Sequence, residues 1–197
     1  MGKRSDFDRI GKDFYKTPYG AVVPLAQHLP STLFTFCEPC AGDGRLISHL
    51  ETAIQPAKCV AAYDIDLTYP RYKGEEWGIE ELDARRLTAD HVNDADFIIT
   101  NPPWSRDKKS GYLLHRLIET FVEIAPTWLL FDADWAHTAQ AQPYTSRWCS
   151  TIVAIGRVKW FEDTNMSGKD NTCWYLFEKD ARQKSAVPEF WGKGFIK

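Results

Sequence analysis

The chain has 197 residues, with 24 Lys and Arg against 27 Asp and Glu, so its formal net charge is -3. Hydrophobic residues make up 44% of the chain and charged residues 26%, which is typical of an ordinary globular domain. This composition excludes a disordered, collagen-like or coiled-coil protein. The small negative charge argues against indiscriminate coating of nucleic acid, but it leaves room for a local basic patch.

Neither a secretion signal nor a membrane span is evident in the sequence. The first six residues carry no apolar stretch, and no apolar run approaches the roughly 18 residues that a span needs. A cytoplasmic protein without a membrane partner is therefore expected. The five cysteines are an odd, scattered set, which makes a poor disulfide framework. Cys37 and Cys40 have the spacing of a redox or zinc pair, but no second pair follows, so no metal site is predicted.

The chain shows no internal repeat, no low-complexity tract and no linker rich in proline, glycine or serine. We therefore expect one domain over residues 1–197, with an N-terminal arm or helix at 1–32, a core at 33–179 and a tail at 180–197. The tail is aromatic enough to dock on the domain or on a second subunit. Both a monomer and a homodimer stay open at this point.

Short apolar runs alternate with longer mixed segments along the core, a pattern typical of a parallel sheet covered by helices on both faces. The runs rich in β-forming residues predict strands at 33–37, 59–63, 96–100, 127–131 and 151–155, with a weaker one at 78–82. Helical spacing and stop signals predict helices at 44–53, just after Pro70, at 112–124 and at 135–148.

The end of the core has a different pattern. Residues 152–159 and 172–177 are apolar runs that flank a polar, turn-rich segment at 163–170. Two such runs around a turn predict an antiparallel hairpin. The sequence therefore predicts an α/β fold with a seven-stranded, mostly parallel sheet that finishes in a hairpin.

The first predicted strand runs into an acidic residue and a glycine-bearing turn, because Glu38 is followed by Gly42 and Gly44. Glycines let the backbone approach a ligand closely, and open α/β sheets bind ligands at the carboxyl ends of their strands. Ile47 stands where a dinucleotide fingerprint would need its third glycine, which disfavours nicotinamide binding. The turn therefore predicts either a nucleotide-cofactor loop or a tight βα turn with glycines for geometry alone.

A second acid supports the cofactor interpretation. Asp64 directly follows the second predicted strand, where a carboxylate can accept hydrogen bonds from both hydroxyls of a ribose. Asp66 is as well placed to cap a helix as to bind a ligand. Asp83 follows the weak strand and could contact the exocyclic amine of an adenine, although an exposed loop acid is an equal interpretation.

The clearest local motif is the tetrapeptide Asn101–Trp104, which directly follows the strand at 96–100. Pro102 and Pro103 end the strand and fix φ, so the Asn101 side chain and the Pro102 carbonyl are held at the strand's carboxyl end. Two such acceptors could bind both hydrogens of an aromatic amine and make its nitrogen a better nucleophile. Trp104 offers a flat face on which a planar base could stack. The structural alternative is a stiff loop whose Trp104 packs into the core.

Taken in order, the segments 38–44 and 101–104 resemble the S-adenosylmethionine-dependent adenine-N6 DNA methyltransferases, including small ones carried by bacteriophages. Residues 14–18 resemble the family segment near the methionine part of the cofactor, and 156–161 resemble its late strand before the base-binding hairpin. The resemblance implies a Rossmann-like class I methyltransferase fold, S-adenosylmethionine as cofactor, and direct methyl transfer to N6 of adenine without a general base. If phage-encoded, the protein would act in the cytoplasm of a bacterial host.

The resemblance and the residue patterns together give three sets of candidate residues. The predicted cofactor-binding residues are Tyr15, Thr17, Pro18, Glu38, Pro39, Ala41, Gly42, Gly44, Asp64, Asp83 and Asn101. The predicted catalytic residues are Asn101, Pro102, Pro103 and Trp104. The predicted substrate-binding residues are Trp104, Arg106, Lys108, Lys109, Trp160 and Phe161. Basic residues after Trp104 would lie beside the base pocket, where they could contact phosphates.

Too few residues flank the predicted core to form a separate recognition domain, so a short or relaxed recognition sequence is expected. DNA is the expected partner and RNA is possible. Two alternatives remain open. A methyltransferase for adenine in RNA or for protein glutamine would use similar Asn-Pro-Pro-aromatic chemistry, because an amide nitrogen poses the same electronic problem. A cofactor- or DNA-binding module without turnover is the non-enzymatic alternative.

Overall fold

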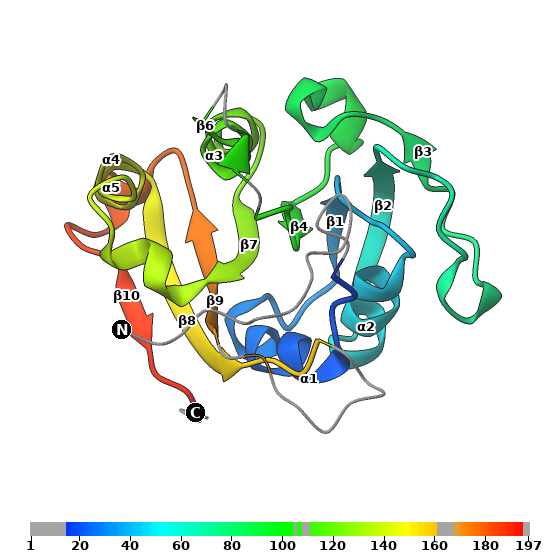
Figure 1. Cartoon of the computed structure of the whole chain (residues 1–197), viewed down its shortest axis with the longest axis horizontal. Helices are drawn as coiled ribbons and strands as arrows, with labels where there is room; N and C mark the ends of the chain where they lie inside the picture. The colour runs from blue at the N-terminus through cyan, green and yellow to red at the C-terminus, as the bar shows by residue number, and fades with distance from the viewer. Residues whose placement is uncertain (1–14, 105, 108–110, 161–167, 169, 195–197) are drawn as a thin grey trace.

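A computed structural model of the chain describes residues 15–104, 106–107, 111–160, 168 and 170–194. Within these residues the main feature is an eight-stranded sheet in the order β10-β8-β9-β7-β4-β1-β2-β3 (Figure 1). Its strands are β1 (Phe34–Glu38), β2 (Ala57–Asp64), β3 (Glu80–Glu81), β4 (Phe97–Thr100), β7 (Thr127–Asp132), β8 (Cys149–Arg157), β9 (Asn171–Phe177) and β10 (Glu189–Trp191). A separate two-stranded ribbon is formed by β5 (Arg106–Asp107) and β6 (Gly111–Tyr112).

All neighbouring strands of the large sheet are parallel except at β9, which runs antiparallel to both β7 and β8. The predicted mostly parallel α/β sheet with a late antiparallel hairpin is therefore confirmed. In β8 the pairing register shifts between Ala154 and Gly156, where Gly156 has a φ of 77°. A β-bulge of this kind bends the strand, and the positive φ is one that glycine adopts without strain.

Helices cover both faces of the sheet (Figure 1). One face carries α1 (Tyr19–Val22), the 3₁₀ helix η2 (Val23–His28) and α2 (Arg45–Ala53). The other face carries α3 (Leu113–Val122) and α4 (Gln142–Arg147), with the short helix α5 (Ala181–Lys184) beside α4. The remaining 3₁₀ helices are η3 (Tyr72–Gly74), η4 (Ala84–Arg86), η5 (Ala89–Val92) and η6 (Ala133–His137).

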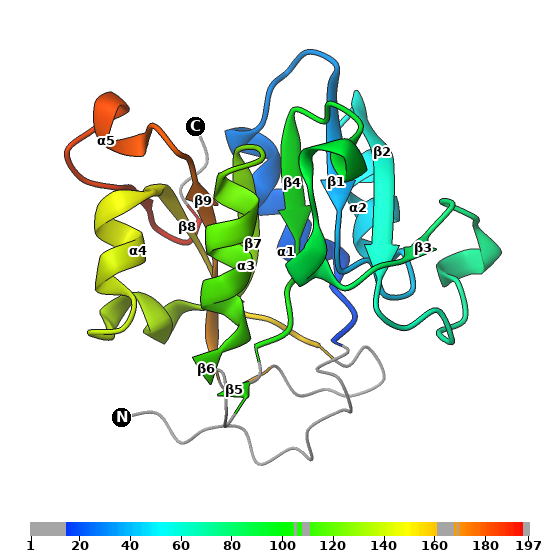
Figure 2. The same ribbon diagram turned by 90° about the horizontal axis from the view of Figure 1, so that it is seen from above.

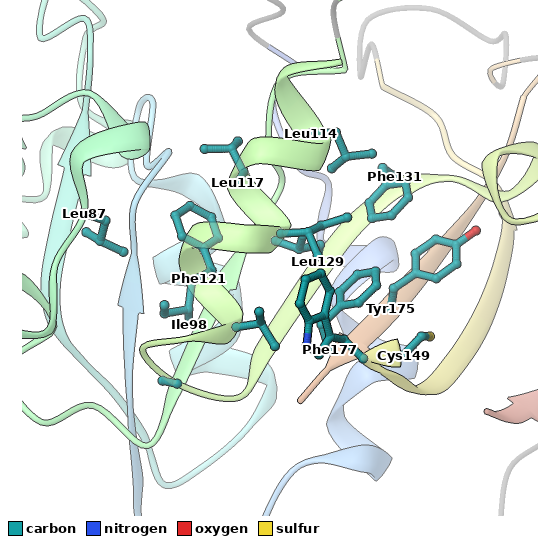
Figure 3. Close-up of a cluster of buried hydrophobic side chains, with 14 of the residues drawn as sticks. Leu87, Ile98, Leu114, Leu117, Phe121, Leu129, Phe131, Cys149, Tyr175 and Phe177 are labelled. Atoms are coloured by element: carbon teal, nitrogen blue, oxygen red, sulfur yellow. The ribbon is translucent and has the colours of Figure 1, made fainter. Parts of the chain in front are cut away.

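The α3 side of the sheet holds a large apolar core. Leu114, Leu117 and Phe121 are buried along one stripe of α3, as residues spaced three and four apart on a helix should be. Figure 3 shows Leu114 beside Phe131 of β7, and Leu117 and Phe121 on the side of α3 toward Leu87 and Ile98. The rings of Phe131 and Tyr175 stack with their centroids 4.3 Å apart. This packing fixes the position of α3 on the sheet.

The opposite face has its own core between α1, η2, α2 and the sheet. Leu46, Ile47 and Leu50 of α2 are buried with Phe36 of β1. The N-terminal segment is joined to the far side of the sheet, because the indole nitrogen of Trp174 in β9 donates to the Ala21 carbonyl at 2.8 Å. Residues 19–28, which the sequence analysis assigned to an N-terminal arm or helix, are therefore an integral part of this layer.

Three sequence predictions need correction. The sheet has an eighth strand, since β10 from the predicted tail pairs in parallel with β8. The predicted helix at 135–148 is two pieces, η6 and α4, because a proline in a helix interior would clash with the preceding turn, and Pro143 stands at the start of α4 instead. The helix predicted after Pro70 is the 3₁₀ turn η3, which has Lys73 at a φ of 55°.

The topology brings several strand ends to one edge of the sheet. The parallel strands β1, β2, β4, β7 and β8 all finish at this edge, and Figure 2 shows β2 and β4 pointing the same way. The chain moves outward from β1 to β2 and β3 in one direction, and to β4 and β7 in the other. Ligands of open α/β sheets bind at such a reversal point, here between β1 and β4.

None of the described helices combines the length and hydropathy that crossing a membrane requires.

Candidate active site

The loop after β1 lies directly against the end of β2. The Gly42 amide donates to Oδ2 of Asp64 at 2.7 Å, and the Ala41 amide donates to the Tyr63 carbonyl at 2.8 Å. Gly42 and Gly44 have φ values of 55° and 82°, which glycine adopts readily and other residues rarely do. The predicted cofactor residues Gly42, Gly44 and Asp64 therefore form one compact unit, with the Asp64 carboxylate half-buried beside the turn.

Glu38 occupies the base of this unit at the end of β1. Its side chain is fully buried, and Oε1 accepts a hydrogen bond from the Cys40 amide at 3.1 Å. Burial raises the pKa of this carboxyl from 4.5 to about 8, and nearby Thr100 of β4 offsets part of the rise. Oε2 has no hydrogen-bond partner among the described residues. A buried polar atom without a partner is costly in a folded chain, so this atom is a candidate ligand contact.

The remaining residues of the loop are well packed. Pro39 and Ala41 are buried between Glu38 and Gly42. Cys37 is buried in the core, and burial raises the pKa of its thiol. All five cysteines are free thiols. No group of three potential metal ligands is found in the described parts of the chain.

Asn101 is held by the N-terminal segment. Its side-chain nitrogen donates to the Tyr15 carbonyl and to the Thr17 hydroxyl, each at 3.1 Å. A backbone carbonyl can only accept, so the amide nitrogen must face Tyr15 and the Asn101 oxygen Oδ1 must face away from it. Oδ1 accepts no hydrogen bond from any residue that the structure describes. The geometry therefore fixes the amide and leaves its oxygen available to a donor.

Three aromatic rings meet beside Asn101. The rings of Trp104 and Trp160 meet edge to face with centroids 5.7 Å apart, and Tyr15 packs against Trp160 at 6.0 Å. The indole nitrogen of Trp104 donates to the Leu130 carbonyl of β7 at 3.2 Å, which fixes the ring. All three residues are half-buried. This Tyr15–Trp104–Trp160 group, called the aromatic cluster below, brings together residues predicted separately from the sequence.

The other predicted site residues differ in how well the structure places them. Pro18 caps α1, and its carbonyl accepts from the Ala21 amide at 2.9 Å. Pro102 is buried and Pro103 half-buried, so both stiffen the turn after β4. Arg106 lies in β5 with only its backbone described, while Lys108, Lys109 and Phe161 lie outside the described residues. Their substrate contacts stay predictions.

Asp83 has an ion pair within its own loop. Its carboxylate caps η4 and accepts from the Arg85 amide at 3.0 Å and the Arg85 Nε at 2.9 Å. The Arg85 side chain beside it lowers the pKa of Asp83. An adenine contact by Asp83 stays a prediction, and it would have to use acceptor positions that Arg85 leaves open. Asp66 caps the next turn by accepting from the Thr68 amide at 3.0 Å.

Sequence reasoning missed the segment that covers the glycine turn. Arg71 donates to the Gly42 carbonyl at 3.1 Å, and the Tyr72 amide donates to the Asp43 carbonyl at 2.8 Å. Trp77 packs so closely on Gly44 that a Cβ there would lie 2.3 Å from its ring. The one available signal was an isolated tryptophan in an otherwise polar stretch. The sequence analysis also did not predict that Ile65, directly after Asp64, would be 55% exposed.

No family model matches the sequence, and no curated protein sequence matches it. Solved structures do match. A protein from Pyrococcus horikoshii assigned as an RNA methyltransferase aligns with a TM-score of 0.60 at 13% identity, over 90% of this chain and 93% of its own. A Listeria monocytogenes protein assigned as a class I S-adenosylmethionine-dependent methyltransferase aligns with a TM-score of 0.60 at 10% identity, over 88% and 62% of the two chains.

The methyltransferase subunit of a type I restriction-modification system from Streptococcus thermophilus aligns with a TM-score of 0.53 at 12% identity, over 88% of this chain and 46% of its own. The chain thus spans about half the length of such modification subunits. Together these likenesses show that the chain has the class I methyltransferase fold. At such low identities the fold carries over but the substrate does not.

Proposed function

We propose that the protein is a methyltransferase that moves the methyl group of S-adenosylmethionine to the exocyclic N6 amine of adenine in DNA, with short or relaxed sequence specificity. The observation that carries the proposal is the orientation of Asn101, whose nitrogen is bonded to the N-terminal segment and whose oxygen is left for a donor. An acceptor with this fixed direction beside a stiff diproline turn suits an amine that must present two hydrogens.

The residues around the glycine turn fit this cofactor. Oε2 of Glu38 is a buried polar atom without a partner among the described residues, and the cofactor has an amino group and hydroxyls that could pair with it. Asp64 lies at the carboxyl end of β2, where a ribose is bound in folds of this type, and its carboxylate already orders the turn through Gly42. The structural neighbours support the same cofactor, since one is assigned as an S-adenosylmethionine-dependent class I enzyme. When bound, the cofactor would supply an electrophilic methyl group on a sulfonium.

The chain's own residues would act on the base. Oδ1 of Asn101 and the Pro102 carbonyl would accept the two amine hydrogens, which would localise the nitrogen lone pair for attack on the methyl group. The aromatic cluster would hold the planar base by stacking against one of its rings. After transfer the extra proton of the amine would leave to solvent, so no general base is required. The adenine would have to be flipped out of a duplex or already unpaired.

The assignment of the polymer rests on the resemblance of the motifs to the DNA enzymes, and a restriction-modification subunit among the neighbours supports it. A neighbour assigned as an RNA methyltransferase keeps RNA as the second candidate. A cytoplasmic location, a monomer or homodimer, and a single domain over residues 1–197 complete the proposal.

The test is a methyl-transfer assay with labelled cofactor on unmodified DNA, RNA and protein, followed by digestion and mass spectrometry. The expected product is N6-methyladenine in DNA. Asn101→Ala should lower the rate by about 100-fold, the scale of one lost preorganised contact, while cofactor affinity changes by no more than about threefold. Asn171→Ala, at an exposed asparagine on the same sheet edge, is the matched control and should keep the rate. Label in RNA or in protein glutamine would show that this is the methyl acceptor instead of adenine in DNA. Cofactor binding without methyl transfer would indicate a non-catalytic module.

A further inference from the structure

We propose that His49 of α2 is a positioning residue for the acceptor asparagine, acting through Thr17. The inference rests on the proposed function, because it takes Asn101 to be the group that binds the amine. No sequence pattern singles out His49, whose nearest histidine neighbours in the chain have no ligand spacing to it. Its role follows from contacts between three elements that lie far apart in the sequence.

Thr17 is bonded at two atoms. Its hydroxyl accepts from the Asn101 side-chain nitrogen at 3.1 Å, and its carbonyl contacts Nδ1 of His49 at 3.0 Å. Thr17 is only 4% exposed and His49 only 6%. Because buried polar atoms are strongly held to their partners, the position of the Thr17 hydroxyl depends on the histidine ring behind it. The direction of the Asn101 amide depends in turn on that hydroxyl.

The contacts define the state of the ring. The Thr17 carbonyl can only accept, so Nδ1 of His49 must carry a hydrogen and donate it. In the neutral ring Nε2 is then an acceptor, and the hydroxyl of Tyr72 lies 3.4 Å from it. Edge contacts from Tyr19 at 5.6 Å and Tyr72 at 5.4 Å hold the plane of the ring. The histidine ring is therefore held in position and orientation, with Nδ1 as the donor to Thr17.

The same ring also connects to the glycine turn. Tyr72, which contacts Nε2, donates its amide hydrogen to the Asp43 carbonyl at 2.8 Å. Asp43 lies between Gly42 and Gly44, the residues of the candidate cofactor loop. His49 thus joins the loop on one side to the N-terminal segment and Asn101 on the other. This arrangement would align the acceptor amide with the cofactor loop, a task that a purely apolar core residue could not perform.

Replacements at position 49 separate positioning from packing. The side-chain nitrogen of asparagine can take the place of Nδ1, that of glutamine the place of Nε2, and leucine only fills space. His49→Asn should keep kcat within about threefold, whereas His49→Leu and His49→Gln should lower it by about 10- to 100-fold, the scale of a misplaced reacting group. KM for the nucleic acid and the cofactor Kd should stay within about threefold in all three. His28→Leu, a histidine on η2 that packs on Trp128 and Trp191, is the matched control and should keep kcat.

Substitutions at Thr17 provide an independent test if the His49→Leu variant does not fold. Thr17→Val removes the hydroxyl at nearly constant size and should lower kcat as His49→Leu does, whereas Thr17→Ser should keep it. Full turnover by Thr17→Val would overturn the proposal, as would equal losses in folded His49→Asn and His49→Leu. Full turnover by Asn101→Ala would instead refute the proposed function, so the two failures are distinguishable.

Discussion

Replacing Gly44 with alanine tests whether Trp77, in the segment after β2, packs on the glycine turn. Gly44 has a φ of 82°, and a Cβ built on it would lie 2.3 Å and 2.5 Å from two ring carbons of Trp77. An alanine therefore meets two separate penalties, one from the backbone and one from the tryptophan. Gly78 offers a matched control, since its φ is 61° but a Cβ added to it would have no described atom within 4 Å.

The two penalties can be estimated. A non-glycine residue in the left-handed region costs about 1–2 kcal/mol, which both alanine variants should lose. Overpacking costs about 1–3 kcal/mol more, and only Gly44→Ala should lose it, because the half-buried Trp77 ring must shift. The expected loss is thus about 2–5 kcal/mol for Gly44→Ala against about 1–2 kcal/mol for Gly78→Ala. With a typical stability of about 5–15 kcal/mol, both variants should fold.

The assay is urea unfolding followed by far-ultraviolet circular dichroism, which does not depend on the fluorescence of Trp77 itself. The decisive comparison is a double-mutant cycle with Trp77→Ala. In the Trp77→Ala background, Gly44→Ala should cost no more than Gly78→Ala. Equal losses for the two glycine variants in the wild-type background would refute the packing of Trp77 on the turn.

Two further predictions concern the carboxylates of the site. Because burial raises the pKa of Glu38 to about 8, the folded chain keeps a proton that the unfolded chain releases near pH 4.5, so the free energy of unfolding should fall between about pH 5 and 8, by up to about 5 kcal/mol. Glu38→Gln cannot ionise and should reduce that fall in urea titrations at pH 5 and 8.5; an unchanged slope would contradict the burial effect. Asp64→Ala should weaken cofactor binding in isothermal titration by at least about tenfold, against little change for Asp66→Ala, and an unchanged Kd would remove Asp64 from the site.

The strands were predictable because local signals delimit them. The predicted strand at 127–131 is β7 (Thr127–Asp132) in the structure. The predicted strand at 96–100 is β4, which ends at Thr100, directly before Asn101 and Pro102. Alternation of such runs with helical segments was enough to predict a parallel sheet, and parallel strands bring Glu38, Asp64 and Asn101 to one edge whatever the side-chain details. That is why the sequence could indicate where the site lies.

The missed features depend on contacts between distant segments. β10 is a short run whose Phe190 stays 68% exposed, so its own composition does not specify a strand, and it forms one only against the edge of β8. The Thr17–Asn101 bond joins residues 84 positions apart, and the contact of Trp77 with Gly44 depends on the path of an irregular loop. Periodicity along the chain carries no information on such pairs, so the contacts of His49 and Trp77 could be found only from the structure.

The proposed mechanism requires the Asn101 oxygen and the cofactor loop to face the same reaction site. This requirement is tested most directly by a crystal structure of the protein with S-adenosylhomocysteine, the demethylated cofactor product. We expect the ribose hydroxyls on Asp64, the sulfur on the side of the crevice that faces Asn101, and the Asn101 nitrogen still on Tyr15 and Thr17. A ligand bound away from the β1–β4 crevice, or an Asn101 oxygen turned toward the Tyr15 segment, would contradict it.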